Sequence, residues 1–280
     1  MLKLMQTGQP SRTALSAAAH RAAHQVLEQG RIFADPLALR ILGPDADAIV
    51  ARMAAQPARR GMRLFIAART RFAEDALAAA VSRGVRQLVV LGAGLDTFAY
   101  RNPHQGLKVF EVDYPATQAW KRHRLADAGV IAPACLTYTP VDFERSTLGE
   151  GLAIAGFDPA RPSFFTWAGV VPYLTREAVL GTLAFIGALP GGAEVTFDYS
   201  DPPETLPPDQ RAAQAERAAT VAAAGEPWIT HFAPDELALE LRGLGFTEIE
   251  DLGPREITAR YFKEPAPDRT RGGHLLRART

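Results

Sequence analysis

The chain has 280 residues and a mass of 30.2 kDa, the length of one large domain or two small ones, and 47% of its residues are hydrophobic. Its 31 basic and 31 acidic residues give a formal net charge of +0, so we expect no nucleic-acid or membrane partner. One cysteine, Cys135, excludes an intramolecular disulfide and a cysteine-built metal site, which fits a cytoplasmic protein. No signal peptide or membrane span is predicted, because no apolar run is long enough.

Residues 1–82 predict a helical cap. From Ser11 to Val81 the sequence is rich in Ala, Leu and Arg, and glycines and prolines divide it into several short helices. His20 and His24 lie one helical turn apart, a spacing that can bind a metal ion. No third ligand lies near them, so a solvated helix face is the better interpretation and no metal site is predicted.

The central part of the chain, residues 83–264, predicts a parallel α/β core. A short apolar run at residues 87–91 is closed by Gly92, as expected for a strand buried on both faces. Similar runs cover residues 107–112, 136–141, 163–167 and 193–197. The segments between them can hold helices, including one at 175–188 with Thr175 as its N-cap. This alternation predicts right-handed βαβ units.

The rest of the chain predicts a lid, a helix, a hairpin and a tail. Four prolines between Asp201 and Pro208 require a loop, and the polar helix at 209–224 suits a lid, which we place at about residues 201–230. A helix at 234–244 precedes runs at 247–252 and 257–262, which the Gly253-Pro254 break would join as a hairpin. The Arg-rich residues 265–280 predict a mobile tail.

A glycine loop follows the first strand. The amides of Gly92, Ala93 and Gly94 can approach a ligand at the carboxyl end of the sheet, where open α/β sheets bind ligands. The dinucleotide fingerprint needs a small residue where this chain has Thr97, and Asp96 would repel a pyrophosphate. Asp96 can instead pair with an ammonium group or hydrogen-bond within the turn. A nucleoside that carries a cationic amino acid is therefore favoured, and an NAD-dependent oxidoreductase is the weaker alternative.

Carboxylates also stand at the ends of the next two strands. Asp113 ends the second strand, where a carboxylate can accept hydrogen bonds from both ribose hydroxyls. Glu111 points the same way and competes for this role, but Asp113 is nearer the carboxyl end. Asp142 ends the third strand and can accept from an adenine amine, while Phe143 offers its backbone amide. Together these residues predict a nucleoside site.

Six segments, in their order and spacing, resemble the leucine carboxyl methyltransferase-like family, a branch of the class I S-adenosylmethionine-dependent methyltransferases. They lie at residues 33–36 (FADP), 68–72 (ARTRF), 90–97 (VLGAGLDT), 110–115 (FEVDYP), 141–143 (VDF) and 173–175 (YLT). The resemblance implies a Rossmann-like fold with a seven-stranded, mostly parallel sheet, an antiparallel C-terminal strand and a helical cap that closes over the active site. It also implies S-adenosylmethionine as cofactor and S-adenosylhomocysteine as product.

The resemblance assigns roles to individual residues. Arg69 would hold the carboxylate of the methionine moiety, and Gly92 would allow close backbone approach to it. Asp113 would hold the ribose, with Asp142 and Phe143 at the adenine. The other residues assigned to the cofactor site are Ala93, Gly94, Asp96, Tyr114 and Trp167.

Two arginines and one alanine also lie at motif positions of the family. Arg71 and Arg101 either contact the cofactor or form ion pairs that fix the cap and the turn. Members of the family usually have a glutamate after the fourth strand, where this chain has Ala168. The loss of that carboxylate leaves two hypotheses: a methyltransferase with a changed acceptor, or a protein that binds S-adenosylmethionine and S-adenosylhomocysteine without turnover.

The reaction implied is O-methylation of a small-molecule or peptide acceptor, because the family includes protein-carboxylate enzymes and polyketide O-methyltransferases of secondary metabolism. A carboxylate acceptor needs no general base, whereas a hydroxyl needs one, and His231 after the predicted lid is the candidate. The alternative for His231 is a helix cap or a packed side chain. Tyr173 either touches the reactive centre or packs. Candidate walls of an acceptor pocket, or else core residues, are Trp120, Trp167 and Trp228.

Overall fold

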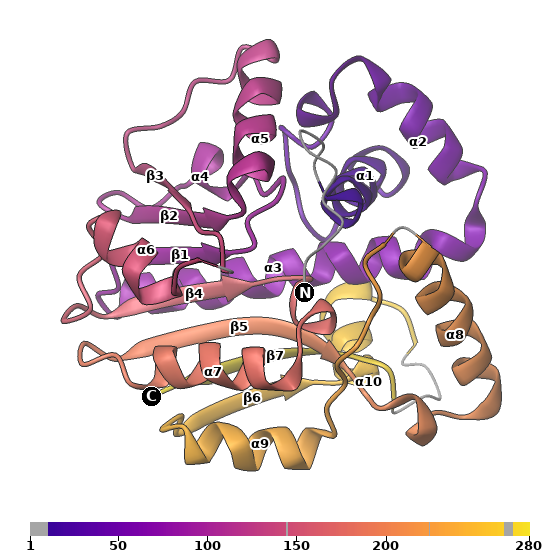
Figure 1. The fold of residues 1–280 in the computed structure, drawn as a ribbon. Helices are drawn as coiled ribbons and strands as arrows, with labels where there is room; N and C mark the ends of the chain where they lie inside the picture. The colour runs from indigo at the N-terminus through magenta and orange to yellow at the C-terminus, as the bar shows by residue number, and fades with distance from the viewer. Residues whose placement is uncertain (1–10, 144, 224, 266–270) are drawn as a thin grey trace.

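A computed structural model of the chain describes residues 11–143, 145–223, 225–265 and 271–280. In these ranges seven strands form one sheet in the order β3-β2-β1-β4-β5-β7-β6 (Figure 1). The strands β1 to β5 pair in parallel, and β7 runs antiparallel to both β5 and β6. Their bounds are β1 Gln87–Leu91, β2 Lys108–Asp113, β3 Leu136–Pro140, β4 Ser163–Trp167, β5 Ala193–Ser200, β6 Glu248–Leu252 and β7 Gly273–Arg279. The predicted seven-stranded, mostly parallel sheet is confirmed.

Helices cover both faces of this sheet. The α-helices are α1 Arg12–Leu27, α2 Ala46–Ala54, α3 Arg60–Ser82, α4 Phe98–Arg101, α5 Pro115–Asp127, α6 Leu148–Ile154, α7 Arg176–Gly187, α8 Pro208–Ala223, α9 Pro234–Gly243 and α10 Pro254–Ile257. Short turns of other helix types are η1 Arg40–Asp45, η2 Pro57–Arg59, η3 Val171–Tyr173, η4 Pro203–Thr205 and η5 Thr258–Phe262. The N-cap predicted for α7 is confirmed, because the Thr175 side chain accepts from the amide of Ala178.

Two apolar clusters explain why the central strands are apolar on both faces. On one face, Val89 of β1 and Phe165 of β4 belong to a cluster with side chains of α6, α7 and α9. On the other face, Leu88 and Phe164 pack with Leu77 of α3. Figure 1 shows α3 running along the sheet, and α3 contacts β4, β5 and β7. The third helix of the predicted cap is therefore also a layer of the core.

The first two helices pack beside the glycine end of the sheet. Ala18 and Ala22 of α1 share an apolar cluster with Ile41 and Leu42 of η1 and with Leu95 of the glycine loop. Small residues on α1 let these backbones approach closely. The cap is thus built directly onto the loop that follows β1.

The hairpin predicted from residues 247–252 and 257–262 is wrong in its second half. The first run forms β6, but Pro254 starts α10 and the chain continues as η5. Proline is well suited to the first turn of a helix. Ile257 and Tyr261, four residues apart, both contact the apolar cluster over β7, which is the spacing of one helix face.

The mobile tail predicted for residues 265–280 is also wrong where the structure describes it. Residues 273–279 form β7, which lies between β5 and β6, while residues 266–270 lie outside the described ranges. Arg277 Nε lies 2.7 Å from Glu194 Oε1 of β5, and Glu250 of β6 lies 3.7 Å from the same guanidinium. Acidic residues on both neighbouring strands thus allow an Arg-rich segment to form an internal strand.

The predicted solvated face at His20 and His24 is corrected as well, because both side chains are buried. His24 Nδ1 lies 3.2 Å from Glu28 Oε2, and burial lowers the pKa of His20 to about 4. In the described ranges, no cluster of three or more His, Cys, Asp or Glu side chains could hold a metal ion. None of the helices described there has the length and apolarity needed to cross a membrane.

Candidate functional site

The glycine loop leaves no space for larger side chains. Gly92 and Gly94 have φ angles of +60° and +48°, which favour glycine. A Cβ at Gly92 would lie 2.6 Å from Val170 Cγ2, and one at Gly94 would lie 3.1 Å from Ala14 Cβ. Both α1 and the loop after β4 therefore pack directly on the glycine loop.

Asp113 links the second strand to this loop. Its Oδ2 accepts from the amide of Gly94 at 2.5 Å, and its Oδ1 accepts from the amide of Tyr114 at 2.6 Å. Burial raises the pKa of Asp113, although both backbone hydrogen bonds act in the opposite direction. The sequence left two roles for Asp96, an ion pair with an ammonium group or a hydrogen bond within the turn. The structure shows the second, since Asp96 Oδ1 accepts from the amide of Phe98 at 2.8 Å.

Glu111, the competitor of Asp113, lies in a separate buried pair. Its side chain is fully buried, and its Oε2 accepts from Lys121 Nζ at 2.7 Å. Burial raises the pKa of Glu111 to about 7 in spite of the neighbouring ammonium group. Since Lys121 occupies this carboxylate, Asp113 is the acidic group of β2 that reaches the carboxyl edge.

The ends of β2 and β3 meet at this edge. The amide of Val141 donates to the carbonyl of Asp113 at 2.9 Å, which brings Asp142 next to Asp113 in the fold. Asp142 Oδ2 lies 3.6 Å from Arg145 Nε. Phe143 and Tyr114 are exposed residues, at 58% and 39%. The edge thus presents carboxylates together with accessible aromatic rings.

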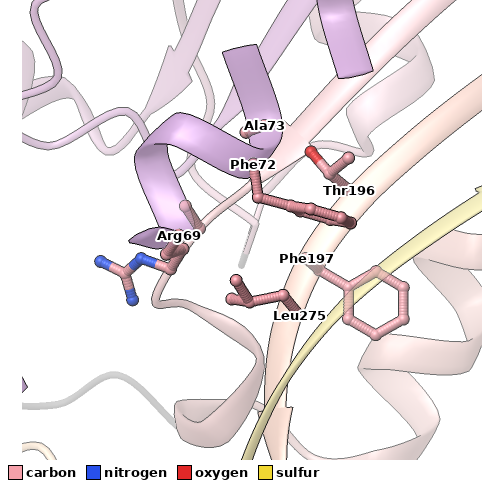
Figure 2. A pocket seen from close by; sticks show the side chains of 7 residues that line it. Arg69, Phe72, Ala73, Thr196, Phe197 and Leu275 are labelled. Atoms are coloured by element: carbon pink, nitrogen blue, oxygen red, sulfur yellow. The ribbon is translucent and has the colours of Figure 1, made fainter. Parts of the chain in front are cut away.

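Arg69 meets a carboxylate that the sequence analysis did not identify. Its Nη1 donates to Asp198 Oδ2 of β5 at 2.9 Å, and Asp198 Oδ1 accepts from the amide of Gly169 at 2.5 Å. Figure 2 shows the guanidinium of Arg69 directed away from the apolar side chains of Phe72 and Leu275. Polar residues stand at alternate positions of β5, at Glu194, Thr196, Asp198 and Ser200, and this alternation was the available signal.

Ala168 and Trp167 lie beside this pair. A cavity of about 10 Å³, room for the centre of about one water molecule, is lined by Ala168, Arg69, Thr196 and apolar residues of α3, β5 and β7. Trp167 is only 3% exposed and packs against Phe197, with ring centroids 6.4 Å apart. Its position is that of a core residue, and the ring presents little surface to a ligand.

A second cluster gathers beside the loop after β4. The amides of Ile229 and Thr230 donate to the carbonyl of Pro172, at 2.8 and 3.3 Å. Trp228, Arg69, Asp198 and Glu226 all lie close enough to influence the pKa of Tyr173, which burial raises. Tyr173 and Trp228 are thus brought together next to the Arg69–Asp198 pair.

His231 lies at the end of β5 in the same region. Its Nδ1 is 2.9 Å from Ser200 Oγ, and burial lowers its pKa. Ser200 lies two residues after Asp198, so the two side chains point to the same side of β5. The lowered pKa favours the neutral imidazole, and the ring contacts the side chain two residues along β5 from Asp198.

The remaining candidates form ion pairs or pack against the cap. Arg101 donates to Glu74 Oε2 at 3.0 Å and lies 3.7 Å from the buried Asp35, which is the ion-pair alternative considered above. Arg71 pairs with Asp75 on the exposed side of α3. Trp120 is partly buried against the cluster of α1 and η1. Arg101 thus connects the loop after β1 to the cap and Trp120 packs against the cap, whereas the Arg71 pair lies within α3 alone.

Comparison with known proteins agrees with this geometry. Residues 14–187 match the family model described as "Leucine carboxyl methyltransferase". The Bacillus subtilis protein named "Putative S-adenosyl-L-methionine-dependent methyltransferase YktD" is 36% identical over 200 residues, 70% of this chain and 65% of that protein. A Frankia alni protein of the same description, FRAAL3718, is 37% identical over 63% of this chain and 64% of its own length. The matched parts therefore span slightly less than two thirds of these relatives.

Solved structures show the same fold. A crystal structure titled as a putative methyltransferase from Thermobifida fusca matches with a TM-score of 0.62 and 17% identity, covering 100% of this chain and 97% of the other. A DUF574 family protein from Streptomyces avermitilis matches with a TM-score of 0.54 and 16% identity, covering 94% and 97%. At these identities the likeness concerns the fold alone.

Proposed function

Because the chain belongs to the leucine carboxyl methyltransferase family, we propose that it is an S-adenosylmethionine-dependent O-methyltransferase. Its acceptor is a small molecule or a peptide that offers a carboxylate or a hydroxyl group. The observation that carries this proposal is the carboxyl edge of the sheet, where the Asp113 carboxylate adjoins the amide of Gly94 and the end of β3. We place the reaction in the reducing cytoplasm, which suits a chain with one free cysteine, Cys135.

The residues at this edge fit the cofactor. Gly92 and Gly94 keep the loop free of side chains, so a ligand can approach the backbone once the covering segments yield. Asp113 is suited to the ribose hydroxyls, Asp142 and Phe143 to the adenine, and Arg69 to the methionine carboxylate. When bound, the cofactor supplies an electrophilic methyl group on a sulfonium.

The protein contributes position and desolvation. Methyl transfer is an in-line displacement, so the acceptor oxygen must be held opposite the sulfonium in a site that excludes water. Tyr173 and Trp228 are suited to form walls of this acceptor site. An ionised carboxylate would react directly. A hydroxyl would transfer its proton to the neutral His231 as the carbon–oxygen bond forms.

Calorimetric titration with S-adenosylmethionine, S-adenosylhomocysteine and NAD tests the cofactor assignment. We expect the first two to bind and NAD not to bind. The Asp113→Ala variant should bind S-adenosylhomocysteine about 100-fold or more weakly, because two hydrogen bonds to a charged acceptor are lost. Asp127→Ala, an exposed carboxylate on α5, is the control that should leave affinity unchanged. A folded wild-type protein that binds neither S-adenosylmethionine nor S-adenosylhomocysteine would overturn the proposal.

A second function is motivated by Ala168. If the side chain at this position is needed for turnover, the protein binds S-adenosylmethionine without methylating an acceptor. A screen of carboxylate and phenol acceptors separates the two functions, since turnover with any of them excludes the second. The Ala168→Glu variant belongs in the same screen: activity that appears only in this variant would support the second function.

A further inference from the structure

Asp198 holds two separate segments of the chain at once. Its Oδ2 accepts from Arg69 of α3 at 2.9 Å, and its Oδ1 accepts from the amide of Gly169, in the loop after β4, at 2.5 Å. Asp198 is itself 5% exposed. A buried carboxylate with one partner on each oxygen fixes the relative position of both partners.

The guanidinium of Arg69 also packs against the backbone of the loop after β4. Gly169 has a φ of +72°, and a Cβ there would lie 2.5 Å from Arg69 Nη1. The next residue, Val170, packs on Gly92 of the glycine loop. Arg69 therefore contacts Gly169, and the residue after Gly169 covers the glycine loop at the carboxyl end of β1.

Arg69 retains hydrogen-bonding capacity in this position. A guanidinium has five N–H donors, and the bond to Asp198 uses one of them, on Nη1. The Nε atom is buried and has no hydrogen-bond partner among the described residues. Guanidinium groups bind carboxylates through two parallel hydrogen bonds, provided that the planar group is correctly oriented.

We propose that Asp198 is the positioning residue for Arg69: it orients the guanidinium so that the remaining donors receive the carboxylate of the cofactor's methionine moiety. This inference rests on the proposed function. Ala168 has no carboxylate to offer, and in the described part of the chain Asp198 is the acidic side chain paired with Arg69. Asp198 also compensates the charge of the partly buried guanidinium before the ligand arrives.

Two ligands that differ in the amino-acid moiety test the proposal. S-Adenosylhomocysteine carries the carboxylate, whereas 5′-methylthioadenosine has the same nucleoside and thioether without it. We expect Asp198→Asn to weaken binding of S-adenosylhomocysteine at least about tenfold and binding of 5′-methylthioadenosine less than about twofold. Arg69→Lys, which keeps the charge but loses the planar fork, should show the same selectivity.

The matched control is Glu194→Gln. Glu194 is a buried carboxylate on the same face of β5, paired with Arg277 at the opposite end of the strand. The Glu194→Gln variant should leave the ratio of the affinities for S-adenosylhomocysteine and 5′-methylthioadenosine unchanged, even if it lowers the free energy of unfolding. If Asp198→Asn does not fold, Asp198→Glu replaces it, because this variant keeps the charge but displaces it. Asp198→Glu and Arg69→Lys, each tested alone, should then weaken binding of S-adenosylhomocysteine more than binding of 5′-methylthioadenosine.

The outcomes separate this inference from the proposed function. A wild-type protein that binds neither ligand contradicts the proposed function itself. Normal wild-type binding with equal weakening of both ligands in Asp198→Asn means a general structural role, and an unchanged affinity for S-adenosylhomocysteine means no role. Either of these results overturns the inference and leaves the proposed function standing.

Discussion

His231 illustrates how burial sets the charge of a single side chain. Its pKa lies below 6.5 because burial disfavours the imidazolium, and its Nδ1 contacts Ser200 Oγ. When Nδ1 donates to Ser200, Nε2 carries the lone pair that can accept a proton. The ring is then the kind of general base that a hydroxyl acceptor requires.

The His231→Gln variant tests this role. With a phenolic acceptor, we expect kcat to fall about 100-fold or more, while the affinity for S-adenosylhomocysteine changes less than twofold. Because the pKa of His231 is lowered, the wild-type rate should fall as the pH drops, with a midpoint below the ordinary histidine value of 6.5. A carboxylate acceptor is the internal control, since it is already ionised. Equal losses with both acceptors would contradict the base role.

Single residues differ in how far the sequence identifies them. The position of Asp113 beside the glycine loop could be predicted because a strand, its terminal carboxylate and the glycine loop are local features. Asp198 could not, because its partner Arg69 is 129 residues away. The buried pair of Glu111 and Lys121 was missed for a related reason: a lysine on a helix gives no local sign of being buried.

At the scale of elements, a buried polar contact joins α1 to the glycine loop in addition to their apolar packing. Arg21 donates to the carbonyl of Leu95 at 2.5 Å and lies 3.8 Å from Asp35. Asp35 also accepts from Thr97 Oγ1 at 2.7 Å. The cap and the loop therefore share one buried polar network, whose removal should loosen both.

We expect Arg21→Met to lower the free energy of unfolding by about 3 kcal/mol, because it leaves the buried Asp35 with one charged partner fewer. Arg71→Met is the matched control, since Arg71 forms an exposed pair with Asp75 and should cost less than about 1 kcal/mol. Urea unfolding followed by circular dichroism measures both. Similar losses in the two variants would contradict a special role for the buried contact.

Strands with continuous apolar runs were predicted well, and the strand that needs opposite charges from distant segments was not. The strands β1 and β4 lie at the predicted residues, because apolar runs bounded by turns are specific for buried parallel strands. The strand β7 was missed because its arginines suggest solvent. Only the acidic side chains of β5 and β6 make that position favourable, and the sequence does not reveal that these three segments are neighbours.

For the whole molecule, the placement of β7 decides how the sheet is completed. The strand inserts between β5 and β6, so the last described residues tie two parts of the fold together. His274 at its start lies between Asp201, 3.1 Å from Nε2, and Asp251, 3.0 Å from Nδ1. Tyr199 stacks on the imidazole, with ring centroids 4.7 Å apart.

The charge of His274 therefore contributes to global stability. The two carboxylates raise its pKa to about 9 against the opposing effect of burial, whereas an unfolded chain would have the ordinary value of 6.5. A raised pKa means that the stabilisation is fully present below about pH 6.5 and is lost as pH rises through about 9. We expect the free energy of unfolding to fall by about 3 kcal/mol across that range.

The His274→Asn variant separates this effect from other titrations. It should be less stable than the wild type at pH 6 and should lose far less between pH 6 and pH 9.5, so the two stability curves converge. Urea unfolding at four pH values measures the slopes. His123→Asn, an exposed histidine on α5, should keep the wild-type slope. Parallel curves for the wild type and His274→Asn would mean that the imidazole is neutral in the fold and that β7 is held by packing and backbone hydrogen bonds instead.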